Sequence, residues 1–268
     1  RRAIIILTFL GGLASTVFIP LIAWWMHVLG WRDTMLALGF LHLAVCAPLH
    51  AQLLKDAPPS RLALRCDTAH ADLRTHLHDT TFWLIGVFMV LLMAVTAALP
   101  AHMINLLRET GWSEAWVLTI PAAIGVLQVL GRAALFVLEH RVHVHLTNRW
   151  VPCLIPLGFA LLWLGGTHGA VAVLFVLIYG MGNGMFTIVK GTVVAQYVSQ
   201  AHVGSLNGVL GVPMAVARAA APWIMGALWQ PDVGYDHGLW VMLLLACLGV
   251  GALWWAQHRV QHSAAHHS

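Results

Sequence analysis

The sequence predicts an all-α polytopic membrane protein with about eight transmembrane helices. Of its 268 residues, 60% are hydrophobic and only 9% are charged, whereas soluble domains carry about 25% charged residues. The mean hydropathy of +0.80 leaves too few polar side chains to coat a water-soluble surface. Apolar runs of about 20 residues, long enough to cross a bilayer core as helices, recur along the chain. In chain order they cover residues 3–28, 33–54, 81–103, 113–137, 150–166, 169–192, 203–229 and 238–257.

The first two spans form a separate piece, residues 1–54. The chain opens on "RRAIIILTFLGG" without an initiator methionine, and the apolar run continues past Trp25. Such a run is too long for a signal peptide, so we expect this start to be a truncation within a longer protein. A glycine and an aromatic residue, Gly30 and Trp31, are expected to close the outer turn between the two spans.

Residues 55–80 form the longest connection in the chain. The segment, "KDAPPSRLALRCDTAHADLRTHLHDT", is polar, basic and marked by Pro58-Pro59. Such a shift in composition is typical of a linker between bundles. It separates the first two helices from a six-helix bundle and short tail, residues 81–268.

Basic residues predict how the chain is inserted. Cytoplasmic loops of membrane proteins are enriched in Lys and Arg. If the start is cytoplasmic, the outside segments contain only Arg32 and Arg108, and both ends of the chain are inside. The inside segments then contain Arg1, Arg2, Lys55, Arg61, Arg65, Arg74, Arg141, Arg149 and Arg259.

Arg218 is the strongest candidate for a functional residue. It lies near the middle of an apolar helix, where a charge costs at least ~2.5 kcal/mol and is normally functional or paired. No acidic residue lies deep in any predicted span. We therefore expect Arg218 to face a water-filled cavity, an anionic ligand or a helix outside this sequence. The structural alternative is an ion pair with an acid in that outside part.

A second group of polar residues lies within "YGMGNGMFTIVKGTVVAQ", residues 179–196. Asn183, Thr187 and Lys190 follow i, i+4, i+7 spacing and share one stripe of a helix, which we expect to line a cavity. The alternatives are that Lys190 snorkels to the membrane surface and that Asn183 only bonds a neighbouring helix. Three glycines expose backbone for close packing or bending of a mobile helix, at positions 180, 182 and 184.

Gln128 and Arg132 form a shorter stripe, with i, i+4 spacing on another helix. They carry the same two alternatives, hydrogen bonding between helices for Gln128 and snorkelling for Arg132. Together with Arg218 and Lys190, Arg132 gives this half of the chain a positive interior. The substrate class that we expect is therefore an organic anion. A proton is a candidate coupling ion, although no proton-carrying residue is evident.

The 17 histidines raise the alternative of a haem- or metal-binding membrane subunit of an oxidoreductase. Neither loop cluster has the fixed ligand spacing of a metal site, so we expect solvated histidines and no cofactor or metal. His42 and His50 lie eight residues apart on one span, without a matching pair on another. The sequence shows no nucleophilic side chain within plausible reach of a general base, so we do not expect an enzyme. The clusters are Cys66, Asp67, His70, His76 and His78, and His140, His143 and His145.

Four segments resemble the major facilitator superfamily. "GWRDTMLALGF" (30–40) resembles the turn into that family's sixth helix. Three further segments resemble the eighth, tenth and eleventh helices of that family, in this order: "GVLQVLGR" (125–132), "YGMGNGMFTIVKGTVVAQYV" (179–198) and "GSLNGVLGVPMAVARAAAP" (204–222). By this resemblance the chain covers helices five to twelve of twelve. It comprises the last two helices of an N-terminal half-bundle and a complete C-terminal one.

The resemblance implies a secondary active transporter that works by alternating access between two half-bundles. It also implies a bacterial inner membrane and a substrate path shared with the missing N-terminal helices. The stretch "GRAALFVLEHRVHVHLTNR" keeps Gly131, Arg132, Glu139 and Arg141 of a family gating motif, but without its compact spacing.

Overall fold

A computed structural model describes the backbone of residues 2–53, 55, 75–138, 141, 144–165 and 168–265, and most of their side chains. The chain divides into two compact units, residues 13–72 and residues 1–12 with 73–268. All described elements are helical, apart from one isolated bridge between Gln230 and Gly234. This confirms the predicted all-α fold. The proposed division at residues 54 and 81 stays a prediction.

The smaller unit contains most of α1 (Arg2–Leu41), then η1 (His42–Cys46) and α2 (Ala47–Leu53). The predicted turn appears as a sharp kink at Gly30, with φ 77° and ψ 172°. Only glycine adopts this backbone without strain. The Thr34 hydroxyl donates to the Gly30 carbonyl at 2.7 Å, one turn after the kink.

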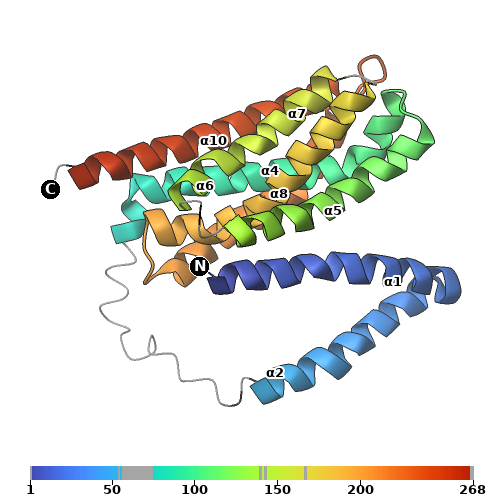
Figure 1. Ribbon diagram of the computed structural model, residues 1–268, viewed down its shortest axis with the longest axis horizontal. Helices are drawn as coiled ribbons and strands as arrows, with labels where there is room; N and C mark the ends of the chain where they lie inside the picture. Colours follow the sequence, from blue (N-terminus) through green and yellow to red (C-terminus); the bar gives the residue numbers. More distant parts are fainter. Residues whose placement is uncertain are drawn as a thin grey trace. The chain divides into compact units, whose positions relative to one another are not determined.

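The larger unit is a helical bundle in which both neighbouring helices and helices far apart in sequence pack together (Figure 1). α4 packs against α9 and α10, while α8 packs against α5 and α7. Fully buried side chains such as Phe88, Phe159 and Phe175 form its core. Its elements are α4 (Thr80–Glu109), α5 (Glu114–Leu138), α6 (Val144–Trp150), η3 (Val151–Cys153), α7 (Leu154–Leu164), α8 (Gly169–Tyr197), α9 (Val203–Ala227) and α10 (Asp236–Ala265).

Local signals set the helix ends more closely than hydropathy does. The Asp79 carboxylate accepts from the Thr81 backbone N–H at 2.9 Å and caps α4. Gly111, with φ 86°, ends the turn after α4. The predicted span 150–166 consists mainly of η3 and α7 and begins at the last residue of α6, with Pro152 inside the 3-10 turn. Because proline has no N–H, it cannot continue the α-helical bond pattern there.

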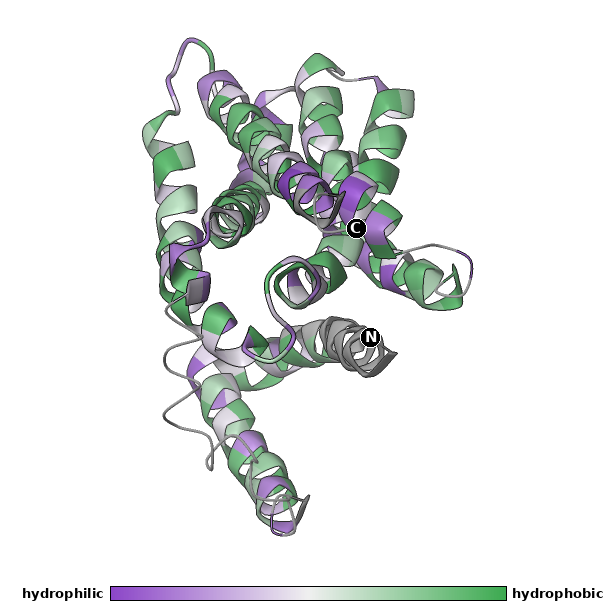
Figure 2. Cartoon of the chain, turned by 90° about the vertical axis from the view of Figure 1, so that its left-hand side faces the viewer, coloured by the Kyte–Doolittle hydropathy of each residue, from purple (hydrophilic) through white to green (hydrophobic). Residues whose placement is uncertain are grey.

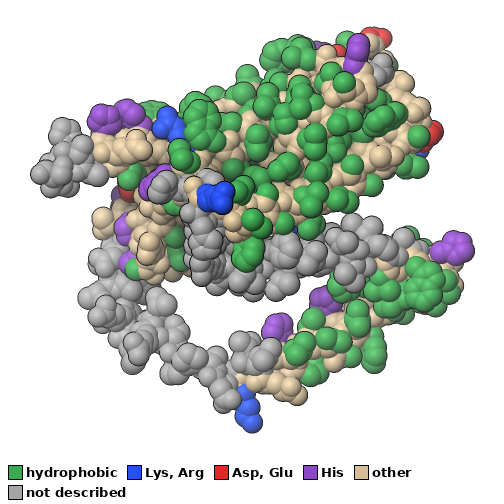
Figure 3. Space-filling view, viewed as in Figure 1, with side chains coloured by type: hydrophobic (Ala, Val, Ile, Leu, Met, Phe, Trp, Pro, Cys, Tyr) green, Lys and Arg blue, Asp and Glu red, His purple; other side chains and the backbone are tan. Residues whose placement is uncertain are grey.

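Six described helices are long and apolar enough to cross a membrane: residues 24–52, 80–109, 114–138, 169–197, 203–227 and 236–262. Hydrophobic residues run along these helices in Figure 2. Large apolar side chains also cover the outside of the larger unit (Figure 3), including Trp223, which is 74% exposed. A surface this apolar requires a lipid environment. The molecule is therefore a multi-pass membrane protein.

Most charged side chains of the larger unit that are visible in Figure 3 lie toward its two ends. Arg132, Lys190 and Arg218 instead lie within α5, α8 and α9. Basic residues gather where α5 and α10 finish, namely Arg141, Arg149 and Arg259. Acidic residues gather at the opposite end, where α4 finishes and α10 begins, namely Glu109, Glu114, Asp232 and Asp236. The described helices therefore run between one basic and one acidic end.

A buried network of hydrogen bonds connects three helices at the basic end of the bundle. Asn148, which is fully buried, donates to the Gln196 side chain and accepts from Thr192 at 3.3 Å. Gln257 of α10 donates to the Tyr197 hydroxyl at 3.2 Å. Satisfied buried polar groups of this kind fix one helix arrangement over others. The network therefore holds α6, α8 and α10 in register.

Tyr179 is expected to be a stability defect that phenylalanine repairs. Its ring is fully buried beside Phe159 and Phe175, yet its hydroxyl has no hydrogen-bond partner among the described residues. An unpaired buried hydroxyl costs about 1–3 kcal/mol. Tyr179→Phe should therefore raise the thermal midpoint in detergent. The matched change Tyr197→Phe should lower it, because that hydroxyl accepts from Gln257. Equal shifts for the two variants would contradict this interpretation.

Candidate functional site

The candidate site is a groove of about 470 Å³ within the larger unit. Such a volume is in the range of small-molecule sites. α9 supplies most of its wall, and one residue each comes from α4 and α8. Its described lining is Met93, Lys190, Gly211, Met214, Ala215, Arg218 and Ala219. Because Met93 lies near the middle of α4, the groove reaches the middle of the bundle.

The groove brings together two of the predicted site residues, Arg218 and Lys190, from different helices. Both side chains are positively charged, and like charges that line one groove repel each other. Neither side chain has a carboxylate partner among the described residues, whose one ion pair is Arg108–Glu114 at 2.9 Å. Lys190 is half-buried and Arg218 is exposed in the described structure. Two cations without a carboxylate partner that line one groove attract an anion.

Two prolines on α9 flank Arg218, at positions 213 and 222. Each lacks the N–H that would bond the carbonyl four residues earlier. The carbonyls of Val209 and Arg218 consequently lack their usual helical donors. α9 is therefore weakened on both sides of the segment that carries the guanidinium. His102 of α4 contacts this helix, since its Nε2 donates to the Pro222 carbonyl at 2.8 Å.

Arg132 occupies a different place, inside the α5–α8 interface. It is only 9% exposed, and its Nε donates to the Gly184 carbonyl at 3.3 Å. The Thr187 hydroxyl donates to the same carbonyl at 2.8 Å. Arg132 is not among the described residues of the groove. The structure thus separates it from Arg218 and Lys190.

The glycines near Asn183 allow α8 to pack closely against two neighbouring helices, α5 and α7. A Cβ on Gly184 would overlap the Gln128 backbone of α5, and one on Gly180 would lie 2.8 Å from Leu127 Cβ. On the other side, a Cβ on Gly182 would lie 2.6 Å from Leu154 Cβ of α7. The predicted close packing is therefore confirmed. α8 runs unbroken through the three glycines, and its mobility stays a prediction.

Asn183, Thr187 and Lys190 are each half-buried on α8. They lie between buried positions such as Gly182 and Phe186. Of the three, the described groove includes only Lys190. Gln128 is also half-buried, and its backbone rather than its side chain meets Gly184. Roles for Asn183, Thr187 and Gln128 in a substrate path stay predictions.

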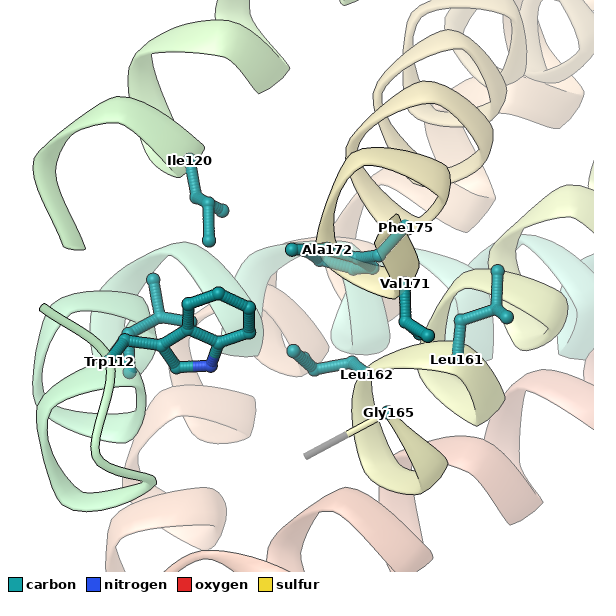
Figure 4. Close-up of a pocket in the computed structure, with 9 residues that line it drawn as sticks. Trp112, Ile120, Leu161, Leu162, Gly165, Val171, Ala172 and Phe175 are labelled. Atoms are coloured by element: carbon teal, nitrogen blue, oxygen red, sulfur yellow. The ribbon is translucent and has the colours of Figure 1, made fainter. Parts of the chain in front are cut away.

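Two other cavities differ from the groove in chemistry. One is a void of about 10 Å³ lined by apolar side chains. In Figure 4 the Trp112 ring points toward α7 and α8. A void of this size barely admits one water molecule. A wider cavity of about 560 Å³ lies at the acidic end and includes Glu109 and Tyr235. Burial, and then the Glu109 carboxylate, raise the pKa of the Tyr235 phenol. The phenol therefore stays protonated and can donate to His102 Nδ1, 3.2 Å away.

The histidine clusters are only partly described. Cys66, Asp67, His70, Glu139, His140 and His143 lie outside the described residues. Within the described part of the chain, no group of three or more His, Cys, Asp or Glu side chains could hold a metal ion. His42 lies in η1 and His50 in α2, and both are exposed.

Sequence reasoning missed most of the groove wall. Gly211, Ala215 and Ala219 repeat every four residues, beside Met214 and Arg218 with the same spacing. Residues four apart lie on one face of a helix, so this ridge could have been found from the position of Arg218. Met93 had no such signal, because it reaches the groove through a contact between α4 and α9.

Comparison with known proteins leaves the family open. No protein-family model and no curated protein matches this chain.

Proposed function

We propose that this protein is a secondary active transporter of the major facilitator type that moves a small organic anion across the membrane. The observation that carries the proposal is the pairing of Arg218 and Lys190 in one groove, without a carboxylate among its described lining. Intramembrane cations commonly mark substrate or ion pathways. The sequence resemblance at residues 125–132 and 179–198 supports the choice of family.

The proposed mechanism is alternating access between two half-bundles. An anion enters the groove, its charge is neutralised by Arg218 and Lys190, and a reorientation of the helices exposes it on the other side. The two prolines of α9 favour bending near Arg218. The protein acts without chemical change of its substrate, so it is not an enzyme in this proposal. A proton is the proposed coupling ion.

The proposed location is a cell inner membrane, with both ends of this chain in the cytoplasm. The basic end of the larger unit, with Arg141, Arg149 and Arg259, supports this orientation, because basic residues are retained on the cytoplasmic side. The acidic end is then outside.

The test is anion uptake by the full-length protein reconstituted into lipid vesicles. We expect labelled carboxylates to accumulate under an imposed proton gradient and to be lost when the gradient is collapsed. Empty vesicles provide the control. Absence of uptake, together with a Soret band in the purified protein, would instead favour the haem-binding alternative.

A further inference from the structure

The groove contains two cations where a single negative charge could neutralise only one. Arg218 projects from α9 and Lys190 from α8, so the two positive groups enter the groove from different walls. Like charges that line one groove repel each other. A ligand with one charge would leave the second cation uncompensated, whereas a ligand with two charges could form a charge-assisted hydrogen bond with each cation.

The rest of the lining limits what the body of the ligand can be. Met93 and Met214 supply flexible apolar surface, which adapts to irregular shapes. Small residues on α9 leave space opposite them. The described lining has no hydroxyl, amide or carboxylate side chain to pair with a sugar or polyol. A ligand rich in hydroxyl groups would bury them unpaired, which costs free energy for each group.

We infer that the groove binds a small dianion, whose two negative charges bridge Arg218 and Lys190 across a short apolar skeleton. This inference rests on the proposed function, because it concerns the same groove. The planar guanidinium of Arg218 can form a bidentate pair with a carboxylate or a phosphate, while the Lys190 ammonium is a compact point charge. Dicarboxylates and phosphate monoesters share this chemistry.

The test compares ligands of similar size that differ in charge. Binding of succinate, propyl phosphate and butyrate to the full-length protein is measured by calorimetry in detergent. We expect one of the two dianions to bind at least about tenfold more tightly than butyrate, since charge-assisted pairs are the strong ones. The preferred dianion shows whether the second negative charge belongs to a second carboxylate, as in succinate, or to a phosphate group, as in propyl phosphate.

Lys190→Gln removes one of the two positive charges and so distinguishes the contribution of the lysine from that of Arg218. This variant should bind the preferred dianion and butyrate within about twofold of each other, while Lys190→Arg should keep the preference. Arg259→Gln removes an exposed cation outside the described groove lining and should leave the preference unchanged. Without ligand, Lys190→Gln should raise the thermal midpoint, because it removes the repulsion from Arg218.

Three results would overturn the inference. Equal affinity for butyrate and both dianions would show that one charge is enough. A fall in the thermal midpoint of ligand-free Lys190→Gln would show that contacts of Lys190 stabilise the protein more than the repulsion from Arg218 destabilises it. Failure of every probe to bind would exclude a dianion site. The proposed function survives the first result, since anion uptake would still depend on Arg218, and it falls only if uptake itself is absent.

Discussion

Replacing Arg218 by leucine is expected to abolish anion uptake while leaving the bundle folded. Arg218 lines the groove and has no acidic partner among the described residues, so its loss leaves no carboxylate unpaired there. A hydrogen bond to a charged group contributes about 1.5–3 kcal/mol. Because each 1.4 kcal/mol is tenfold in affinity, binding should weaken roughly 10- to 100-fold. Uptake into vesicles and a thermal melt of the same preparation measure the two effects.

Two control variants make this result specific. Arg218→Lys keeps the charge but loses the planar fork, so it should retain partial uptake. Arg259→Leu removes an exposed arginine near the end of α10 and should transport normally. The site assignment would be wrong if Arg218→Leu took up anions at the wild-type rate. It would also be wrong if the guanidinium proved to be held by a carboxylate remote from the groove.

The second large effect is expected at Gly184, where alanine should separate α5 from α8. The added methyl group would overlap the Gln128 backbone, which cannot move aside as a flexible side chain can. Any shift of α8 would also weaken the bond from Arg132 to the Gly184 carbonyl. Overpacking costs about 1–3 kcal/mol and occasionally more. We expect a lower thermal midpoint and less folded protein in the membrane.

Gly125→Ala provides the matched control for this change. Gly125 lies on α5, and a Cβ there would meet no atom within 4 Å. Alanine inside a helix is favoured over glycine by roughly 0.5–1 kcal/mol, so this variant should be neutral or slightly more stable. Gly131→Ala should resemble Gly184→Ala, because its Cβ would lie 2.7 Å from the Met181 carbonyl oxygen. A stable, well-expressed Gly184→Ala protein would contradict the packing argument.

The fold could be predicted largely from composition because lipid imposes a simple rule. Every backbone group in the bilayer must be paired within the chain, so long apolar runs become helices. Gly30 also marked its turn correctly, since only glycine tolerates that backbone. The division of residues 144–164 was not foreseen, because hydropathy does not register the missing N–H of Pro152. Helix ends such as Asp79 depend on capping rather than on hydropathy.

The site was harder to predict than the fold because it depends on contacts between helices. Spacing along α8 grouped Lys190 with Asn183 and Thr187 on one stripe, of which the described groove includes only Lys190. It could not show that α9 brings Arg218 to the same groove. Nor could it show that Arg132, an equally charged residue, is directed into the α5–α8 interface. Periodicity describes one helix at a time, whereas a groove is made by three.

The alternate glycines of α8 restrict which parts of the protein could move in the proposed transport cycle. Gly180 and Gly184 allow α8 to pack closely against α5, and Gly182 allows it to pack closely against α7. If α8 slid by one turn, about 5.4 Å, side chains would replace the glycines at these close contacts and clash with α5 and α7. α5, α7 and α8 should therefore travel as one rigid block that carries Lys190. Arg218, on a helix interrupted twice by proline, is then the cation free to change its distance from that block, so that opening and closing the groove would change the spacing of its two charges.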